Sequence, residues 1–409
     1  MAMALGLHSL SIPCTVYELR QSETGSRTAG GGMMIGGNSL RILDSWGVYE
    51  KMLPRGYSFD VVHYKDAGGK TVDRYPFGNK GIFGYDGLRI YRQQFLECLY
   101  ETCREKGIRI EFGAKFVRVV EETAAGVTFE LGDGSTRTAA LLIGADGIHS
   151  KVRQYINPGV SAAFVGTMAV TYEVAASQLR VPEDYDFPVQ VTTATGSFVL
   201  APQTPDGSLM LAGRQFPTQD RTREEWAALL ADREGLISLL RQDMASWPDT
   251  VRSALEYINP DTLHVWPFYR LPRLAEGWTS APHRRVVILG DAAHAVPPTT
   301  GQGASMGIED AYALGLLISA QRAAPALGWA DALGFWQAMR QRRLDAVLEL
   351  TRVLNNKRLP SGEQAKLKPG DVWVDESAGN PRQMAWLYEP EIEKEVEAWV
   401  RDTGKGEGE

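Results

Sequence analysis

The stretch from Arg285 to Ile318, RVVILGDAAHAVPPTTGQGASMGIEDAYALGLLI, decides the fold of this chain. It begins with Val286 to Leu289, a short β-branched and apolar run that predicts a buried strand. Gly290 and Asp291 follow directly, so the strand ends at a flexible residue and a carboxylate. The sequence therefore predicts an acidic side chain at the carboxyl end of a central strand.

The second half of the same stretch predicts a glycine turn and a helix. A loop containing Pro298, whose ring fixes the backbone φ angle, leads to Gly301-Gln302-Gly303, and from Ala304 onward apolar residues recur at helical spacing. Glycines allow a ligand to approach the backbone, and the unpaired N–H groups of a first helical turn attract electron-rich oxygen. An ionised Asp291 accepts hydrogen bonds only, which suits a polyhydroxyl chain. Together these features predict a ligand-binding cradle.

A second strand-and-turn motif lies earlier in the chain. Residues 141–153, LLIGADGIHSKVR, form an apolar strand that ends in Gly-Ala-Asp-Gly. Ser150 can cap the helix that follows, and we expect the first turn of that helix to present N–H groups to a ligand. Asp146 is the acidic residue of this motif.

The first predicted strand, Cys14 to Leu19, carries Glu18 near its end. In a dinucleotide-binding fold an acidic residue at this place binds the adenosine ribose, about 20 residues after a G-x-G-x-x-G loop. Here Met1 to Leu10 resembles the second half of the first helix, and neither the preceding strand nor the glycine loop is in the sequence. Two explanations stay open: a truncated gene model or alternative start, which we expect, or a shortened protein that binds flavin poorly or not at all.

The segment GDAAHAVPPTTGQGASMGIEDAYAL closely resembles the second flavin-binding signature of the single-component (group A) FAD-dependent aromatic hydroxylases. The GADG motif resembles the DG motif of the same family, which serves both FAD and the pyrophosphate of NADPH. Related members include salicylate-hydroxylase-like enzymes and the monooxygenases that inactivate tetracyclines. The resemblance implies an FAD-dependent enzyme.

The family pattern also assigns cofactor contacts to positions of this sequence. It implies that Asp291 holds the ribitol and that the backbone of Gly301, Gly303 and Ala304 faces the pyrimidine end of the isoalloxazine, with Pro298 shaping the loop beside the ring. The remaining FAD-binding residues that it implies are Glu18, Arg92, Phe116 and Asp146.

The expected fold is α/β: a Rossmann-like FAD-binding domain that lacks its first strand, interleaved with a substrate domain built on an antiparallel sheet. We expect the first part of the FAD-binding domain at 1–160, with a hairpin insertion at 57–90. The substrate domain spans 161–275, the second part of the FAD-binding domain 276–355, and a helical tail 356–409.

Alternating apolar and polar residues between about Phe164 and Pro272 predict the antiparallel sheet, which forms the substrate wall in related enzymes. Gln190 and Arg214 lie on predicted strands and are candidate substrate-binding residues, or face solvent. The basic run from Arg340 to Arg343 is interpreted as a solvated helix face.

The resemblance implies a monooxygenase in which NADPH reduces the flavin, O₂ adds at its C4a, and the hydroperoxide hydroxylates or epoxidises a small aromatic or polyketide-like substrate. The cofactor supplies the chemistry, so no catalytic side chain and no metal are predicted; His294 is more often a packing residue at this position. Two alternatives share these motifs: a flavin-free relative that binds or isomerises a small molecule, and an FAD oxidoreductase that does not oxygenate.

Composition narrows the class of protein further. A net charge of −7 argues against a nucleic-acid partner. The sequence contains no run of 18 apolar residues, so we expect no transmembrane span. Three cysteines without metal-ligand spacing are typical of reduced thiols in a cytoplasmic protein.

Overall fold

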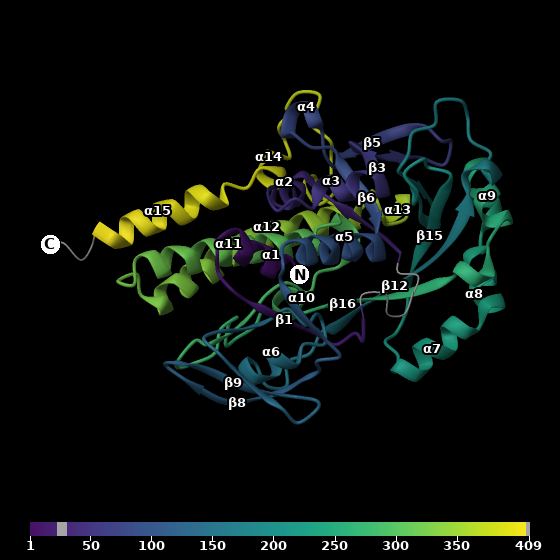
Figure 1. Ribbon diagram of the computed structural model, residues 1–409. Helices are drawn as coiled ribbons and strands as arrows, with labels where there is room; N and C mark the ends of the chain where they lie inside the picture. Colours follow the sequence, from purple (N-terminus) through teal and green to yellow (C-terminus); the bar gives the residue numbers. More distant parts are fainter. Residues whose placement is uncertain (23–30, 406–409) are drawn as a thin grey trace.

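The computed structural model describes residues 1–22 and 31–405 of the chain. Its elements form a mixed α/β architecture in which strands from distant parts of the chain pair with one another (Figure 1). The expected α/β class is confirmed. Among the described residues no helix has the length and apolar composition that a membrane span requires.

The strands of residues 1–22 and 31–405 form five sheets. Their bounds are β1 Thr15–Glu18, β2 Gly32–Ile35, β3 Tyr57–Phe59, β4 Val61–Lys65, β5 Thr71–Pro76, β6 Gly87–Tyr91, β7 Arg109–Phe112, β8 Phe116–Thr123, β9 Gly126–Leu131, β10 Thr136–Ala139, β11 Leu142–Gly144, β12 Ala163–Ala175, β13 Val189–Thr193, β14 Gly196–Pro202, β15 Leu209–Pro217, β16 His264–Arg270 and β17 Val286–Ile288.

Helices cover these sheets and form the tail. Their bounds are α1 Ala2–Ser9, α2 Gly37–Ser45, α3 Tyr49–Met52, α4 Lys80–Phe83, α5 Arg92–Glu105, α6 Lys151–Ile156, α7 Arg223–Ala231, α8 Arg233–Leu240, α9 Asp249–Glu256, α10 Asp291–His294, α11 Gly303–Ala323, α12 Trp329–Asn356, α13 Ser361–Gln364, α14 Ala385–Tyr388 and α15 Ile392–Lys405.

Two short parallel pairs carry the predicted motifs. Strand β1 pairs with β7, and β11 pairs with β17, whose three valine and isoleucine side chains are all fully buried. Because β11 and β17 are parallel and in register, the chain leaves both strands at the same edge. The GADG turn and the Gly290 turn therefore lie side by side.

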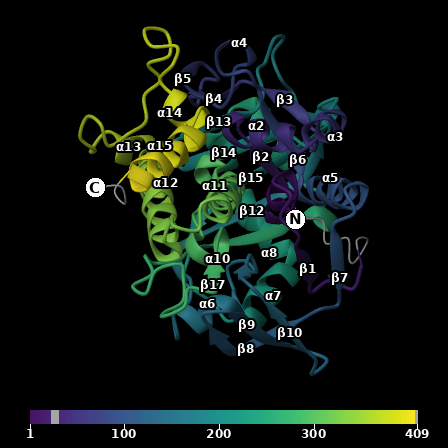
Figure 2. The ribbon, with the colours of Figure 1, turned by 60° about the vertical axis from the view of Figure 1, so that its left-hand side comes forward.

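Helix α11 begins after the Gly301 turn and runs through the middle of the molecule (Figure 2). Its side chains are mostly apolar, and small and large apolar residues alternate on all sides, as expected for a helix that is buried around its circumference. Helices α1, α2, α12 and α15 pack against it. The core of this half of the protein is thus built around the helix that starts at the predicted glycine turn.

The other half is a seven-stranded sheet in the order β16-β12-β15-β14-β13-β4-β5. All its pairings are antiparallel except β13 with β4, which is parallel. One face packs against α7, α8 and α9 in a separate apolar core (Figure 1). Strands β4 and β5 form a hairpin within residues 57–90, where the sequence predicts a hairpin insertion, and this hairpin extends the large sheet because β4 pairs with β13.

Candidate functional site

The turn after β17 has the geometry that the sequence predicts. Gly290 has φ +58°, and Asp291, the first residue of α10, is exposed. The backbone N–H of Gly290 donates to Asp310 Oδ2 at 2.9 Å. A Cβ on Gly307 would lie only 3.3 Å from the Gly290 Cα, so two glycines allow α11 to pass close to the turn. No described residue binds the exposed Asp291 carboxylate, so it can accept hydrogen bonds from a ligand.

The second turn leads into α11. Gly301 has φ +68° and follows the short 3₁₀ segment Pro298–Thr300. Gln302 precedes the helix without a side-chain hydrogen bond to its first turn. Gly303 and Ala304 are only partly buried, so the first-turn N–H groups of a 21-residue helix lie near the surface of the cradle. These groups can donate to a carbonyl oxygen or an anion.

The GADG motif is arranged differently from the expectation. Ser150 caps α6 as predicted, since its Oγ accepts from the N–H of Arg153 at 2.8 Å. However, Asp146 accepts from the N–H groups of Lys151 at 2.7 Å and Val152 at 3.1 Å, and from Ser150 Oγ at 2.5 Å. The first-turn donors that we expected to face a ligand are therefore bound by the protein's own carboxylate. The Asp146 side chain is exposed and still has lone pairs to offer.

Three further predicted residues lie around the β1–β7 pair. Glu18 is half-buried, and its Oε1 accepts from the N–H of Arg20 at 2.9 Å. Phe116 begins β8, close to this edge, because the N–H of Ala114 donates to the Glu18 carbonyl oxygen at 2.9 Å. Arg92 is the exposed first residue of α5, and its side chain binds none of the residues that the structure describes. Their roles toward FAD stay predictions.

The two candidate substrate-binding residues, Gln190 and Arg214, lie on opposite faces of the seven-stranded sheet. Gln190 is opposite Val199 in the sheet register, whereas Arg214 is opposite Phe198. Neighbouring residues of a strand point to opposite faces, so Gln190 and Arg214 lie on different sides of the sheet.

The surroundings of Arg214 show which side it occupies. Its guanidinium donates to the carbonyl oxygens of Thr195 and Gln242 and packs over the rings of Phe216 and Trp247, within the core beneath the α7–α9 layer. Arg214, predicted to bind substrate or to face solvent, therefore does neither and belongs to this core. Gln190 lies on the opposite face, where its side chain donates to Ser197 Oγ. Ser197 Oγ donates to the Arg358 carbonyl oxygen, so this face packs toward the segment that directly follows α12.

A buried charge cluster was not predicted. Arg340, interpreted above as part of a solvated face, is about 1 % exposed and binds both Glu309 and Asp310, which are fully buried. Arg343 binds Glu309 as well. A signal was present, because Arg340 falls between Trp336 and Leu344 on the buried stripe of α12.

The glycine loop of this site, residues 36–38 where the chain passes from β2 into α2, provides a test of whether a flavin fits. A Cβ on Gly36 would lie 2.9 Å from Asn38 Oδ1 and 3.3 Å from Gln302 Nε2. Both atoms are buried, and neither has a hydrogen-bond partner among the described residues. Buried polar groups normally have partners, so an unpaired acceptor and an unpaired donor beside a glycine suit a ligand edge that carries both. With the free Asp291 carboxylate and the α11 N-terminus, these groups fit FAD.

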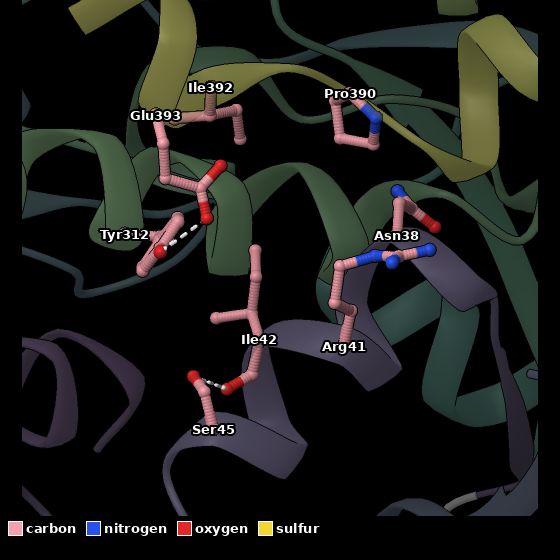
Figure 3. A pocket seen from close by; sticks show the side chains of 8 residues that line it. All are labelled: Asn38, Arg41, Ile42, Ser45, Tyr312, Pro390, Ile392 and Glu393. Carbon is pink, nitrogen blue, oxygen red and sulfur yellow. Dashed lines mark hydrogen bonds between the residues drawn. The ribbon is translucent and has the colours of Figure 1, made fainter. Parts of the chain in front are cut away.

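A small pocket of about 80 Å³ lies beside this region, where α2, α11 and the start of α15 meet (Figure 3). Asn38 and Arg41 line one side, and the Tyr312 hydroxyl, which donates to Glu393 Oε1 at 2.6 Å, lies on the other. None of the site residues predicted from the sequence lines this pocket. We therefore do not assign the cofactor to it.

Comparison with known proteins shows which family this chain belongs to. The chain matches the FAD-binding domain family over residues 2–344 and belongs to that family. It is an FAD-dependent enzyme of the single-component hydroxylase and monooxygenase class.

Individual relatives match along most of the chain or part of it. The chain is 26 % identical over 395 residues to 3-amino-4-hydroxybenzoate 2-monooxygenase PtmB3 of Streptomyces platensis, covering 95 % of this chain and 92 % of that protein. It is 31 % identical over 249 residues to salicylate hydroxylase of Pseudomonas putida, covering 56 % of this chain and 54 % of that protein. The fold superimposes on CtdE in complex with FAD and substrate with a TM-score of 0.77, at 20 % identity, over 100 % of this chain and 97 % of that structure.

Proposed function

We propose that this protein is an NADPH-consuming monooxygenase that hydroxylates or epoxidises a small aromatic or polyketide-like molecule. The observation that carries the proposal is the cradle in which the Gly290 turn and the Gly301 turn meet at α11. Within the described part of the chain, the Asp291 carboxylate, Asn38 Oδ1 and Gln302 Nε2 have no hydrogen-bond partner there. The activities named for its relatives, which act on small hydroxylated aromatic acids, support the substrate class.

Specific residues of the chain would hold the cofactor. Asp291 would accept hydrogen bonds from the ribitol hydroxyls, and the first turn of α11 at Gly303 and Ala304 would donate to the pyrimidine carbonyl oxygens. Glu18 would bind the adenosine ribose, and Asp146 would bind near the pyrophosphate through hydroxyl groups or bridging water. When bound and reduced by NADPH, FAD supplies the chemistry that activates O₂ and transfers one oxygen atom.

The protein's further task is to position the substrate and exclude water. The face of the seven-stranded sheet that carries Gln190 also carries Tyr64 and Val199, and it packs toward the Pro298–Thr300 segment through α12. We place the substrate between this face and the cradle, where Gln190 can both donate and accept hydrogen bonds. The side chains of Tyr64 and Val199 on that face would favour an aromatic ring and limit access of water.

The test begins with flavin binding by the full chain. The purified protein is titrated with FAD, and the absorption spectrum and fluorescence quenching report the bound fraction. Asp291→Ala is compared with Asp261→Ala, which removes another exposed carboxylate, in the loop before β16. The proposal expects wild type and Asp261→Ala to bind FAD equally and Asp291→Ala to bind at least tenfold more weakly.

The second stage tests whether one oxygen atom of O₂ enters the product. NADPH oxidation is measured with a panel of phenols, aminohydroxybenzoates and polyketide phenols, and the products are analysed by mass spectrometry with ¹⁸O₂. Incorporation of one labelled oxygen supports the proposal. NADPH oxidation that yields only hydrogen peroxide with every panel member would favour a non-oxygenating oxidoreductase, and a folded protein that never binds FAD would favour a flavin-free relative.

A further inference from the structure

Two adjacent, fully buried acidic residues of α11 form an ion cluster with two arginines of α12, of which Arg340 is buried and Arg343 is partly buried. Arg340 donates to Glu309 Oε2 and to Asp310 Oδ1, both at 2.7 Å. Arg343 donates to both oxygens of Glu309 at 2.9 and 3.0 Å. Both carboxylates are 0 % exposed, and Arg340 is about 1 % exposed. Burial alone would raise the pKa of Glu309, but Arg343 and Arg340 hold it below its usual value, so the cluster is ionised.

The cluster extends to the segments that form the cradle. Asn38, at the end of the glycine loop, donates through Nδ2 to Glu309 Oε1 at 2.6 Å and to Gln302 Oε1 at 3.0 Å. Asp310 accepts the backbone N–H of Gly290 at 2.9 Å. The glycine loop, the Gly301 turn and the Gly290 turn are therefore all bonded, directly or through one amide, to two neighbouring residues of one helix.

Stability alone gives a weak reason for such a cluster. Removing four charged groups from water is costly, and replacement of buried ion pairs by apolar residues is often neutral or stabilising. Hydrogen bonds of this kind are directional, however, and they fix the relative position of the groups that they join. Three turns that must face one ligand need a fixed spacing more than they need additional stability.

We propose that Glu309 and Asp310 are positioning residues for FAD, which hold the glycine loop, the Gly301 turn and the Gly290 turn at one fixed spacing without contacting the cofactor. This inference rests on the FAD site of the proposed function. Glu309 acts on the glycine loop through Asn38, and Asp310 acts on the Gly290 turn through the backbone. Arg340 joins the two acidic residues, so a change at one is transmitted to both turns.

The experiment compares two buried asparagines. Asn38→Ala removes the bonds to Glu309 and Gln302, while Asn157→Ala removes bonds of similar length to Gly277 and Glu276, which belong to none of the three turns. Asn38 and Asn157 are 0 % and 2 % exposed, so the two variants lose comparable packing. Both are expected to lower the thermal midpoint by a similar amount.

Only Asn38→Ala is expected to change flavin binding. We expect its Kd for FAD to rise at least tenfold, and the visible flavin bands and the fluorescence quenching of the bound cofactor to shift toward those of free FAD. Asn38→Ser, which keeps one donor, should recover part of the affinity. Glu309→Gln leaves Asn38 in place and tests the step through Glu309; it should also weaken FAD binding at temperatures where its circular dichroism matches wild type.

A second readout does not require FAD. In the cofactor-free protein, amide hydrogen exchange across residues 36–39 should become faster in Asn38→Ala and Glu309→Gln and stay unchanged in Asn157→Ala. Equal FAD affinity and equal exchange in Asn38→Ala and Asn157→Ala would overturn the inference. If wild type fails to bind FAD, the proposed function fails, and the positioning role for FAD fails with it even if the exchange difference is present.

Discussion

Replacement of Gly301 by alanine tests the cradle most directly. Gly301 has φ +68°, and a residue with a side chain pays about 1–2 kcal/mol to adopt this left-handed conformation. Its Cβ would lie 3.1 Å from two ring atoms of Phe77 and 3.3 Å from the Cβ of Met34. Phe77 is fully buried and packs against the rings of Phe59 and Tyr75, so it cannot move aside. Such overpacking costs about 1–3 kcal/mol more, and we expect Gly301→Ala to lose about 2–5 kcal/mol.

Gly334→Ala is the matched control. Gly334 lies inside α12, and apart from the neighbouring turns of that helix no described heavy atom lies within 4 Å of the position its Cβ would take. Alanine is favoured over glycine inside a helix by about 0.5–1 kcal/mol, so this variant should gain stability.

The assay is urea unfolding of the FAD-free proteins, followed by tryptophan fluorescence and circular dichroism. The midpoint should fall for Gly301→Ala and rise slightly for Gly334→Ala, with unchanged slopes. The reasoning is refuted if Gly301→Ala is as stable as wild type, or if both variants shift in the same direction. A loss of stability in Gly301→Ala with unchanged FAD affinity would separate the turn from the cofactor site.

Three further predictions concern buried ionisable groups. Burial would raise the pKa of Asp310, but His294 and Arg340 lower it to about 2. The stability that the ionised carboxylate contributes is therefore present above about pH 4, the pKa of this group in the unfolded chain, and is lost as the pH falls toward 2. The difference in thermal midpoint between wild type and Asp310→Asn should shrink over that range, and a constant difference would contradict this prediction. Burial lowers the pKa of Arg89 to about 10, and the hydrogen-bond partner of its side chain among the described residues is the neutral Gln203. Because no described carboxylate offsets this buried charge, Arg89→Met should leave the thermal midpoint unchanged or raise it. A loss of stability as large as that of Gly301→Ala would show instead that the protein stabilises the guanidinium well. Burial raises the pKa of Cys103 to about 11, so a thiol reagent near pH 7.5 should label this residue in the native protein far more slowly than in urea.

The local elements around the cradle were predictable from sequence because their signals are local. A β-branched run followed by Gly290, a glycine turn at Gly301 and a hydroxyl cap at Ser150 each depend on residues within a few positions of one another. The structure places β17, α11 and α6 where these signals predict them.

Features that depend on register or on distant partners were not predictable in the same way. Arg214 and Gln190 both lie on predicted strands, but only the pairing with β14 shows that they face opposite sides. The Arg340 side chain is buried because Glu309 and Asp310, on another helix, compensate its charge. The sequence of α12 alone does not show that Glu309 and Asp310 of α11 lie beside Arg340.

The parallel pairing of β4 with β13 has a consequence for how the protein reaches its native state. The sheet combines residues 61–65 with residues 189–193, and its opposite edge is supplied by residues 264–270. During synthesis the β4–β5 hairpin therefore leaves the ribosome before β13, and its β4 edge stays unpaired until β13 has been synthesised. Unpaired edges are sites of aggregation, and contacts between distant segments slow folding. A fragment limited to residues 161–275 would lack the β4 neighbour of β13, so the two halves of this protein are expected to fold together and not as separable modules.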